Sequence, residues 1–207
     1  ICTAGATDAM DGGKLAWNSP SQDSRGSMPI GNGEIGANVW VEPNGDLLFY
    51  LSKTDAWSEN CRLLKLGKVR VALTPNPLQE GGTFSQTLDL ERGEILVHLK
   101  TPKQDLAIRF AIDARHPVVT VDVDSDQPVE ARVSLEHWRT QRRELKGNEA
   151  HSAYGMLPAG GETVAVAPIM VEPDTIMTGQ KNRVIWYHRN ERSIWMANME
   201  LQALGHE

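Results

Sequence analysis

The chain has 207 residues, of which 40% are hydrophobic and 23% are charged, a composition typical of a folded globular domain. Its formal net charge is −6 at pH 7, which disfavours nucleic acid or an anionic membrane as a partner, because both attract a basic surface. No apolar run approaches the length of a membrane span, so we expect no membrane-spanning segment.

The amino-terminal residues are small and polar. We expect residues 1–16 to form a flexible leader and residues 17–207 to form one domain. The chain begins at Ile1 rather than Met, which favours a processed terminus and a secreted or periplasmic location, with the signal peptide removed. The two cysteines, Cys2 and Cys61, lie far apart in the sequence; two free thiols are favoured over a disulfide.

A dense glycine motif precedes the first long alternating segment. Gly31, Gly33 and Gly36 surround Asn32 and Glu34. Glycines at this density allow positive φ angles and close backbone packing, so the motif predicts a tight turn. Asn32 suits a left-handed turn position by itself, and Glu34 is either a turn residue on the surface or a group that reaches a ligand.

A hairpin is predicted directly after this motif. Residues 35–42 alternate as a strand, Asn44-Gly45 indicates a type I′ turn, and residues 46–53 read as the returning strand. A polar loop over residues 54–60 follows and carries Trp57. Counting outward from the turn brings the glycine motif beside this loop, which predicts one polar edge rimmed by an aromatic ring.

The rest of the chain consists of short alternating segments separated by turn signals. Their spacing of about ten residues predicts an all-β fold, a large antiparallel two-sheet sandwich (a super-sandwich) with little helix. Only residues 60–66 have a pattern that allows a turn of helix. Further strands are predicted near residues 66–74, 83–90, 93–100, 105–113, 117–124, 128–138, 163–171, 183–189 and 193–203.

The sequence also predicts the surroundings of a basic cluster, a long loop and three tryptophans. The basic cluster at residues 139–143 is expected to be a solvated loop, and residues 147–162 a long loop that is functional or disordered. Trp40 and Trp195 lie in strand patterns and are expected in the core. Trp57 lies in a polar segment and is the tryptophan expected near a ligand, because an indole ring offers an apolar face with a polar N–H group.

Three segments together resemble the N-terminal domain of glycoside hydrolase family 95, the α-L-fucosidase and α-L-galactosidase family. They are Ile30-Gly31-Asn32-Gly33-Glu34-Ile35-Gly36-Ala37, Ser52-Lys53-Thr54-Asp55-Ala56-Trp57 and Phe84-Ser85-Gln86-Thr87-Leu88-Asp89-Leu90-Glu91-Arg92-Gly93. The chain departs from the family pattern at Ser52-Lys53, where Asn-Glu is usual, and at Gln86, where Arg is usual. These departures indicate an uncharacterised relative of that family.

The resemblance implies a role. It implies a non-catalytic β-domain, part of a longer chain, which braces a following helical (α/α)6 catalytic barrel and lends loops to a carbohydrate-binding cleft. The alternative is a stand-alone carbohydrate-binding or scaffold β-sandwich without an enzyme. The candidate residues for the cleft or the domain interface are Asn32, Glu34, Thr54, Asp55, Trp57 and Asn60.

No catalytic residue is assigned within the chain. Glycoside hydrolysis requires two carboxyl groups across the sugar, and the resemblance places both in the barrel. The six histidines form neither His-x-His nor His-Glu-x-x-His, so we expect no metal site, and we expect no cofactor.

Overall fold

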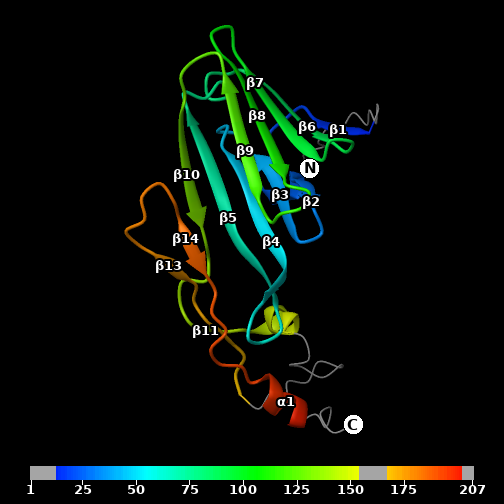
Figure 1. Ribbon diagram of the computed structural model, residues 1–207, viewed down its shortest axis with the longest axis vertical. Coiled ribbons are helices and arrows are strands. Elements are labelled where there is room, and N and C mark those ends of the chain that lie inside the picture. The colour runs from blue at the N-terminus through cyan, green and yellow to red at the C-terminus, as the bar shows by residue number, and fades with distance from the viewer. Residues whose placement is uncertain (1–12, 154–166, 202–207) are drawn as a thin grey trace. The chain divides into compact units, whose positions relative to one another are not determined.

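The computed structural model describes residues 13–153 and 167–201 (Figure 1). Over these residues the chain is mostly strand, and two five-stranded antiparallel sheets pack against each other without closing into a barrel. The predicted all-β two-sheet sandwich is therefore confirmed. No helix of the described part of the chain is long and apolar enough to cross a membrane.

The first sheet has the strand order β1-β6-β7-β8-β9. Its outer strand β1 pairs with β6 antiparallel, with Lys14 opposite Asp89, and the other neighbours are joined as successive hairpins. The strands are β1 (Lys14–Trp17), β6 (Thr83–Asp89), β7 (Glu94–Lys100), β8 (Asp105–Ile112) and β9 (Val119–Ser125).

The second sheet has the order β10-β5-β4-β3-β2. Its edge strand β2 contains Pro29, which an edge tolerates because proline cannot donate a hydrogen bond to a neighbouring strand. The strands are β10 (Glu130–Glu136), β5 (Leu63–Thr74), β4 (Leu47–Trp57), β3 (Ile35–Val41) and β2 (Met28–Gly31).

Shorter elements complete the described structure. They are two strand pairs, β11 (Arg143–Glu144) with β12 (Met170–Val171) and β13 (Thr175–Met177) with β14 (Ile185–Tyr187), two short 3-10 helices, η1 (Ser24–Gly26) and η2 (Gly147–Ser152), and the helix α1 (Trp195–Leu201).

The chain divides into two compact units. The first consists of residues 1–51 and 68–136, and the second of residues 52–67 and 137–207. The strands β4 and β5 therefore contribute residues to both units. Each unit has its own group of buried apolar side chains.

The core of the first unit follows from period-two alternation. Along β8, Leu106, Ile108 and Phe110 are almost fully buried, whereas Arg109 is exposed. The Phe110 ring meets Phe49 of the other sheet edge-on, with ring centroids 4.9 Å apart. Each such buried side chain contributes about 1.5–3 kcal/mol, so alternation on two facing sheets is enough to hold the sandwich together.

The hairpin between β3 and β4 is confirmed, but the type I′ turn is wrong. Gly45 has a φ of +85°, whereas Asn44 is absent from the residues with positive φ. The Gly45 amide donates to the Glu42 carbonyl at 2.8 Å, and the Glu42 amide donates to Asp46 at 3.0 Å. This is a type I turn followed by a left-handed glycine, and Pro43 favours it because its fixed φ fits the first central position.

Several predicted elements differ from the structure. The loop expected over residues 54–60 is strand as far as Trp57, and β5 begins at Leu63, where a turn of helix was allowed. The predicted leader overlaps β1, which begins at Lys14. Of the strand expected over residues 163–171, residues 170–171 are strand (β12) and residues 167–169 are not, while the residues up to 166 lie outside the described ranges.

The strand predicted over residues 193–203 is wrong, because α1 occupies that segment. The Ser193 hydroxyl accepts a hydrogen bond from the Trp195 amide at 3.0 Å, as an N-terminal helix cap does. The Asn198 amide donates to the Ile194 carbonyl at 3.0 Å, which closes a helical turn. Met196 and Ala197 lie between Trp195 and Asn198, and both residue types favour helix over strand.

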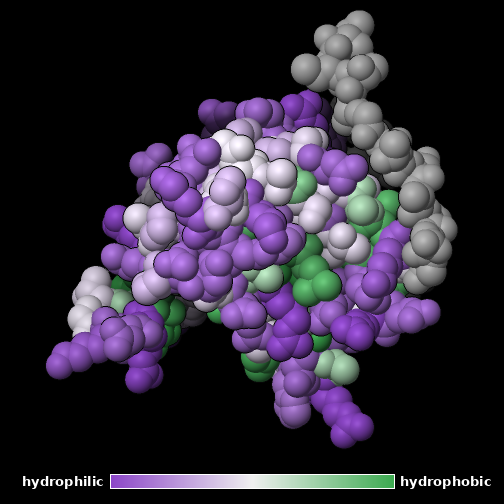
Figure 2. All heavy atoms as spheres, turned by 90° about the horizontal axis from the view of Figure 1, so that it is seen from above, coloured by the Kyte–Doolittle hydropathy of each residue, from purple (hydrophilic) through white to green (hydrophobic). Residues whose placement is uncertain are grey.

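The surface seen in Figure 2 is mainly hydrophilic, with hydrophobic residues in small groups. Most of the exposed large apolar side chains belong to the second unit. These are Trp57, Leu63, Trp138, Ile176, Met177, Val184, Tyr187 and Met196.

Candidate functional site

Asn32 and Glu34, the two candidates from the glycine motif, belong to the first unit. The Asn32 side-chain oxygen accepts hydrogen bonds from the backbone amides of Glu34 and Ile35, both at 2.9 Å. Its amide nitrogen donates to the carbonyls of Asp113 at 2.8 Å and His116 at 3.0 Å. The Asn32 amide thus joins two loops of the first unit, which is a structural role, while the Glu34 side chain is exposed.

Thr54, Asp55, Trp57 and Asn60 belong to the second unit. The first three lie on the final part of β4, and Asn60 lies in the turn that follows. The structure therefore brings these four candidates together within one unit. The predicted edge that combines them with the glycine motif stays a prediction.

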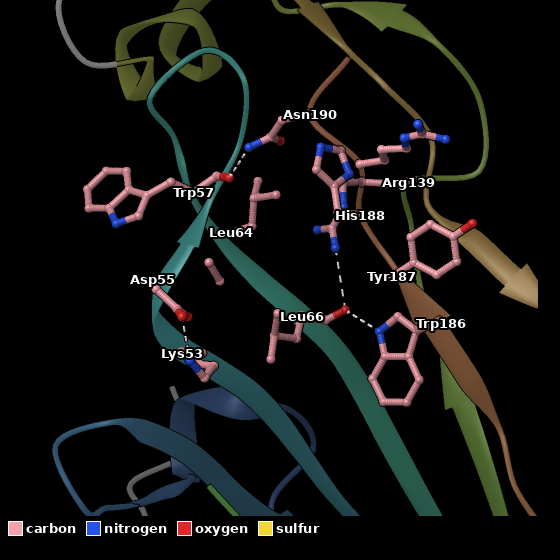
Figure 3. A pocket seen from close by; sticks show the side chains of 12 residues that line it. Lys53, Asp55, Trp57, Leu64, Leu66, Arg139, Trp186, Tyr187, His188 and Asn190 are labelled. Atoms are coloured by element: carbon pink, nitrogen blue, oxygen red, sulfur yellow. Dashed lines mark hydrogen bonds and ion pairs between the residues drawn. The ribbon is translucent and has the colours of Figure 1, made fainter.

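A hollow of about 520 Å³ lies in the second unit, and we call it the aromatic hollow. Figure 3 shows Trp57 and the Lys53–Asp55 pair of β4 on one side of it and Trp186 and Tyr187 of β14 on the other. Leu64 and Leu66 of β5 lie between the two sides. The remaining lining residues are Ala56, Arg139, His188, Arg189 and Asn190.

Two of its aromatic rings are about half-exposed, Trp57 at 48% and Tyr187 at 45%. The Trp57 indole nitrogen donates to the Thr54 carbonyl at 2.9 Å, which holds the ring against its own strand. Asn190 donates to the Trp57 carbonyl at 2.9 Å and ties the segment after β14 to β4. An aromatic face is thus exposed on a fixed backbone, as stacking on a ligand requires.

The Leu66 carbonyl anchors the opposite wall. The Trp186 indole nitrogen donates to it at 2.9 Å, and the Arg139 guanidinium donates to it at 3.4 Å and to the Lys65 carbonyl at 2.8 Å. Arg139 is only 6% exposed, so the prediction that residues 139–143 form a solvated loop is wrong at this position. Its guanidinium bonds carbonyls of β5, which a solvated arginine does not do.

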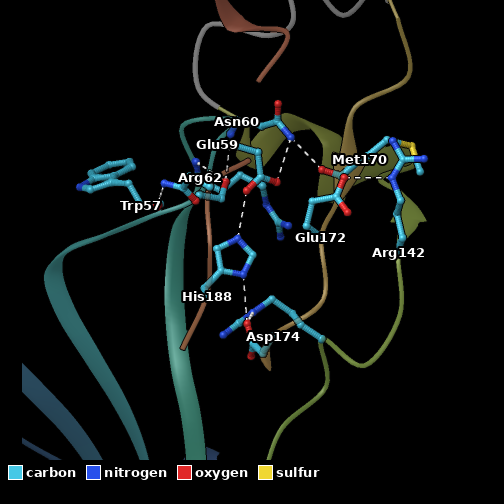
Figure 4. Close-up of polar contacts among 12 residues, drawn as sticks. Trp57, Glu59, Asn60, Arg62, Arg142, Met170, Glu172, Asp174 and His188 are labelled. Carbon is cyan, nitrogen blue, oxygen red and sulfur yellow. Dashed lines mark hydrogen bonds and ion pairs between the residues drawn. The ribbon is translucent and has the colours of Figure 1, made fainter. Parts of the chain in front are cut away.

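Two lining residues of the hollow, His188 and Arg139, form a chain of four charged groups with Glu59 and Asp174, which we call the ionic chain. Figure 4 shows Glu59, His188 and Asp174 of this chain. His188 Nε2 lies 3.0 Å from Glu59 Oε2, and His188 Nδ1 lies 3.0 Å from Asp174 Oδ1. Arg139 Nε donates to the same Asp174 oxygen at 2.8 Å. The side chains of Glu59 and Asp174 are 2% and 0% exposed, so the chain is enclosed in protein.

The ionic chain controls the protonation of its members. Hydrogen bonds to Asp174 and then to Glu59 raise the pKa of His188 to about 9, against the opposing effect of burial. At neutral pH His188 is therefore a cation. Burial alone raises the pKa of Asp174, but hydrogen bonds from His188 and Arg139 outweigh it and the net pKa is lowered. Both partners are held in their charged forms.

The turn after β4 positions Glu59 and Asn60. The Ser58 hydroxyl accepts hydrogen bonds from the amides of Asn60 and Arg62, both at 3.2 Å. Cys61 adopts a left-handed φ of 54°, and its amide donates to the Ser58 carbonyl at 3.1 Å, which closes the turn. Cys61 carries a free thiol, whose pKa burial raises, and Cys2 lies outside the described residues.

The ionic chain does not suit a metal ion. Its two carboxylates bind opposite nitrogens of one imidazole ring, so they cannot converge on a single cation together with that ring. Accordingly, no group of three or more potential metal ligands is found among the described residues.

The sequence prediction missed most of this site. Arg139, Asp174, Trp186 and His188 are far from the Trp57 segment in sequence, and no local pattern joins them. Only Glu59 could have been found from the local sequence. It is a carboxylate directly beside the candidate residue Asn60, in the polar run Ser58-Glu59-Asn60.

Comparison with known proteins gives one family. The model of the N-terminal domain DUF5703_N, described as "Domain of unknown function (DUF5703)", matches residues 16–207. No curated protein matches the chain in sequence.

Proposed function

Because the chain belongs to the DUF5703 N-terminal domain family, a domain of unknown function, we propose its role from the geometry of its own residues. We propose that it is a non-catalytic N-terminal domain of a carbohydrate-active enzyme and that it contacts sugar through the aromatic hollow. In this proposal it also braces a catalytic barrel in the same parent chain, as the resemblance to glycoside hydrolase family 95 implies.

One observation carries the proposal: two half-exposed aromatic rings, Trp57 and Tyr187, line a hollow that also presents charged and amide side chains. A hollow of about 520 Å³ is of the size that small-molecule ligands occupy. Aromatic faces pack on the C–H surface of a sugar ring, and polar side chains such as Asn190 and Lys53 suit its hydroxyl groups.

The protonation of the carboxyl groups supports a binding role rather than hydrolysis. A glycosidase needs a carboxylic acid with a raised pKa that can protonate the leaving oxygen. Beside the hollow, the pKa of Asp55 is lowered by its hydrogen bond to Lys53, and that of Asp174 is lowered within the ionic chain. These two groups are therefore held as carboxylates and do not donate protons; Asp55, which lines the hollow, is the one of the two that a sugar hydroxyl can reach.

Exposed apolar side chains support the bracing role. Leu63 is 57% exposed and Trp138 is 47% exposed, although both belong to types that normally contact other protein. Such residues in one region of a surface mark interaction sites. A domain that supports a larger catalytic domain needs a surface of this kind.

The experiment is glycan binding and turnover by the purified chain. We expect it to bind oligosaccharides on an array and to hydrolyse neither aryl α-L-fucosides nor aryl α-L-galactosides. Turnover that disappears when one carboxylate of the chain is replaced would overturn the non-catalytic role. An array without any binding, on protein shown to be folded, would overturn the sugar-binding role.

The alternative is a stand-alone carbohydrate-binding or scaffold β-sandwich. It is favoured by the fact that every lining residue of the aromatic hollow belongs to one unit of this chain. The two roles differ in the parent gene and in assembly. A helical segment of several hundred residues that follows residue 207 and co-purifies as one folded enzyme supports the first role.

A further inference from the structure

A second hollow, of about 390 Å³, lies in the second unit and shares no lining residue with the aromatic hollow. We call it the arginine hollow. Two guanidinium groups, those of Arg142 and Arg192, meet an otherwise mostly apolar wall there. The remaining lining residues are Asn60, Ala167, Pro168, Met170 and Ile194.

The two arginines are able to bind an anion. Arg142 Nε donates to Glu172 Oε1 at 2.9 Å, which fixes the side chain and leaves its terminal nitrogens for a ligand. Arg192 is exposed and has no hydrogen bond or ion pair to the residues that the structure describes. With Glu172 counted, the pair keeps an excess of one positive charge, and guanidinium groups bind carboxylates in a planar, bidentate fashion.

The wall of the hollow has two further properties. Pro168, Met170 and Ile194 provide an apolar surface, against which a sugar ring packs its C–H face. Asn60, which is 2% exposed, donates to the Met170 carbonyl at 2.7 Å, while its side-chain oxygen has no hydrogen-bond partner among the residues that the structure describes. That oxygen is buried, so a ligand in the hollow does not reach it, and the role of Asn60 is to hold the Met170 segment of the wall in place.

We propose that the arginine hollow binds an acidic sugar, with the carboxylate of a uronic acid residue on Arg142 and Arg192 and the ring on the apolar wall. This inference rests on the proposed function and names the substrate class: a polysaccharide that contains uronic acids. A carboxylate alone needs only the arginines, whereas a uronic acid uses both the charge and the apolar wall.

The test is calorimetric titration of the purified chain with a galacturonic acid trisaccharide and with its methyl ester, which has the same rings without the charge. A neutral galactose trisaccharide and an acidic triglutamate peptide complete the set of probes. The variants are Arg192→Gln and Arg142→Gln, with Arg192→Lys to keep the charge and lose the planar fork. Arg183→Gln is the matched control, because Arg183 is an exposed arginine of the same unit outside the hollow.

We expect the acid to bind about tenfold or more tightly than its methyl ester, because a charge-assisted hydrogen bond is worth at least that factor. Arg192→Gln and Arg142→Gln should each remove most of this preference, Arg192→Lys should restore part of it, and Arg183→Gln should leave it unchanged. The preference should also fall as salt is raised.

Other outcomes overturn the inference. Equal binding of the acid and its ester, unaffected by either arginine variant, would overturn it while leaving sugar binding in place. Equally tight binding of the triglutamate peptide would show a carboxylate site that does not recognise sugar, and would also overturn it. If folded protein binds none of these probes and no glycan of the array, both the proposed function and this inference fail.

Discussion

His188 binds Glu59 across 129 positions of the sequence, with Nε2 of the ring 3.0 Å from Oε2 of the carboxylate. Both side chains are almost entirely buried, and the contact joins the turn after β4 to the segment after β14. Among the described residues, the apolar core of this unit is small. Its buried members are Leu145, Ala150, Ala153, Ile169 and Val171. Apolar packing stabilises the first unit, whereas the second unit depends more on this buried polar contact.

Removing one charge from the ionic chain should destabilise the second unit. In Asp174→Asn and Glu59→Gln, the His188 cation loses a buried partner, and breaking a buried ion pair costs about 3–5 kcal/mol. Urea unfolding monitored by tryptophan fluorescence measures the change. Glu191→Gln is the control, because the Arg189–Glu191 pair is exposed and such pairs contribute about 0–1 kcal/mol. Unfolding midpoints equal to that of the control would show that the ionic chain does not stabilise the unit.

Alkaline pH should also destabilise the second unit. The folded-state pKa of His188 is raised from 6.5 to about 9, so its stabilising contribution is complete below pH 6.5 and is lost as pH rises through about 9. The loss is at most about 3 kcal/mol. Thermal unfolding between pH 6 and pH 10 measures it. His188→Gln should flatten the pH dependence, whereas His151→Gln, which changes an exposed histidine, should keep it. A pH profile unchanged by His188→Gln would contradict this assignment.

Trp57→Ala should weaken sugar binding with near-normal folding. The ring is 48% exposed and donates one hydrogen bond to the backbone, so its removal costs little packing. Loss of a stacking surface should reduce affinity by about tenfold, since aromatic contacts are worth ~1 kcal/mol or more. Titration with the array's best glycan and a melting curve separate the two effects. Trp138→Ala, a similarly exposed tryptophan outside the aromatic hollow, is the control.

In the proposed full-length enzyme, the Trp57→Ala variant distinguishes two roles. Weakened substrate handling by folded protein supports a place at the rim of the sugar-binding cleft. A lower melting temperature with unchanged kinetics of the surviving protein would show that Trp57 only locks the hairpin, and would end the rim hypothesis.

Gly45→Ala should destabilise the first unit more than Gly33→Ala does. Both glycines have positive φ, +85° and +90°, so alanine is strained at either position by roughly 1–2 kcal/mol. A Cβ at Gly45 would lie 2.2 Å from the Asn76 side-chain oxygen, whereas at Gly33 it would meet open space. Asn76 donates to the Gly45 carbonyl at 2.9 Å, and displacing it adds about 1–3 kcal/mol. Denaturant midpoints compare the two variants, and equal losses would show that Asn76 moves aside freely.

Much of the fold of the first unit could be predicted because its signal is local. Alternation in β8 places Leu106, Ile108 and Phe110 on one face whatever the distant sequence contains. Where the prediction failed, neighbouring residues favoured a different local structure. Pro43 changed the turn type, and the Ser193 cap together with helix-favouring residues gave α1 in place of a strand.

The candidate site was predictable only in part, because its geometry depends on tertiary contacts. Trp57 was identified from its polar surroundings, and the structure places it at the aromatic hollow. Arg139 was expected in solvent, because its neighbours Arg142 and Arg143 suggested a charged surface loop. Its burial depends on Asp174 and on carbonyls of β5, and no sequence spacing reveals those partners.

The small apolar core of the second unit links recognition to folding. In the proposed role, a bound sugar ring would supply this unit with apolar contacts that the polypeptide itself provides in the first unit. A ligand present at a hundredfold excess over its Kd adds about 2.7 kcal/mol to the stability of the unit that binds it. Saturating glycan should therefore slow hydrogen exchange in residues 52–67 and 170–188 and leave the sandwich strands of the first unit unchanged. Under this proposal, the ligand would complete the apolar packing of the second unit and could be removed from it.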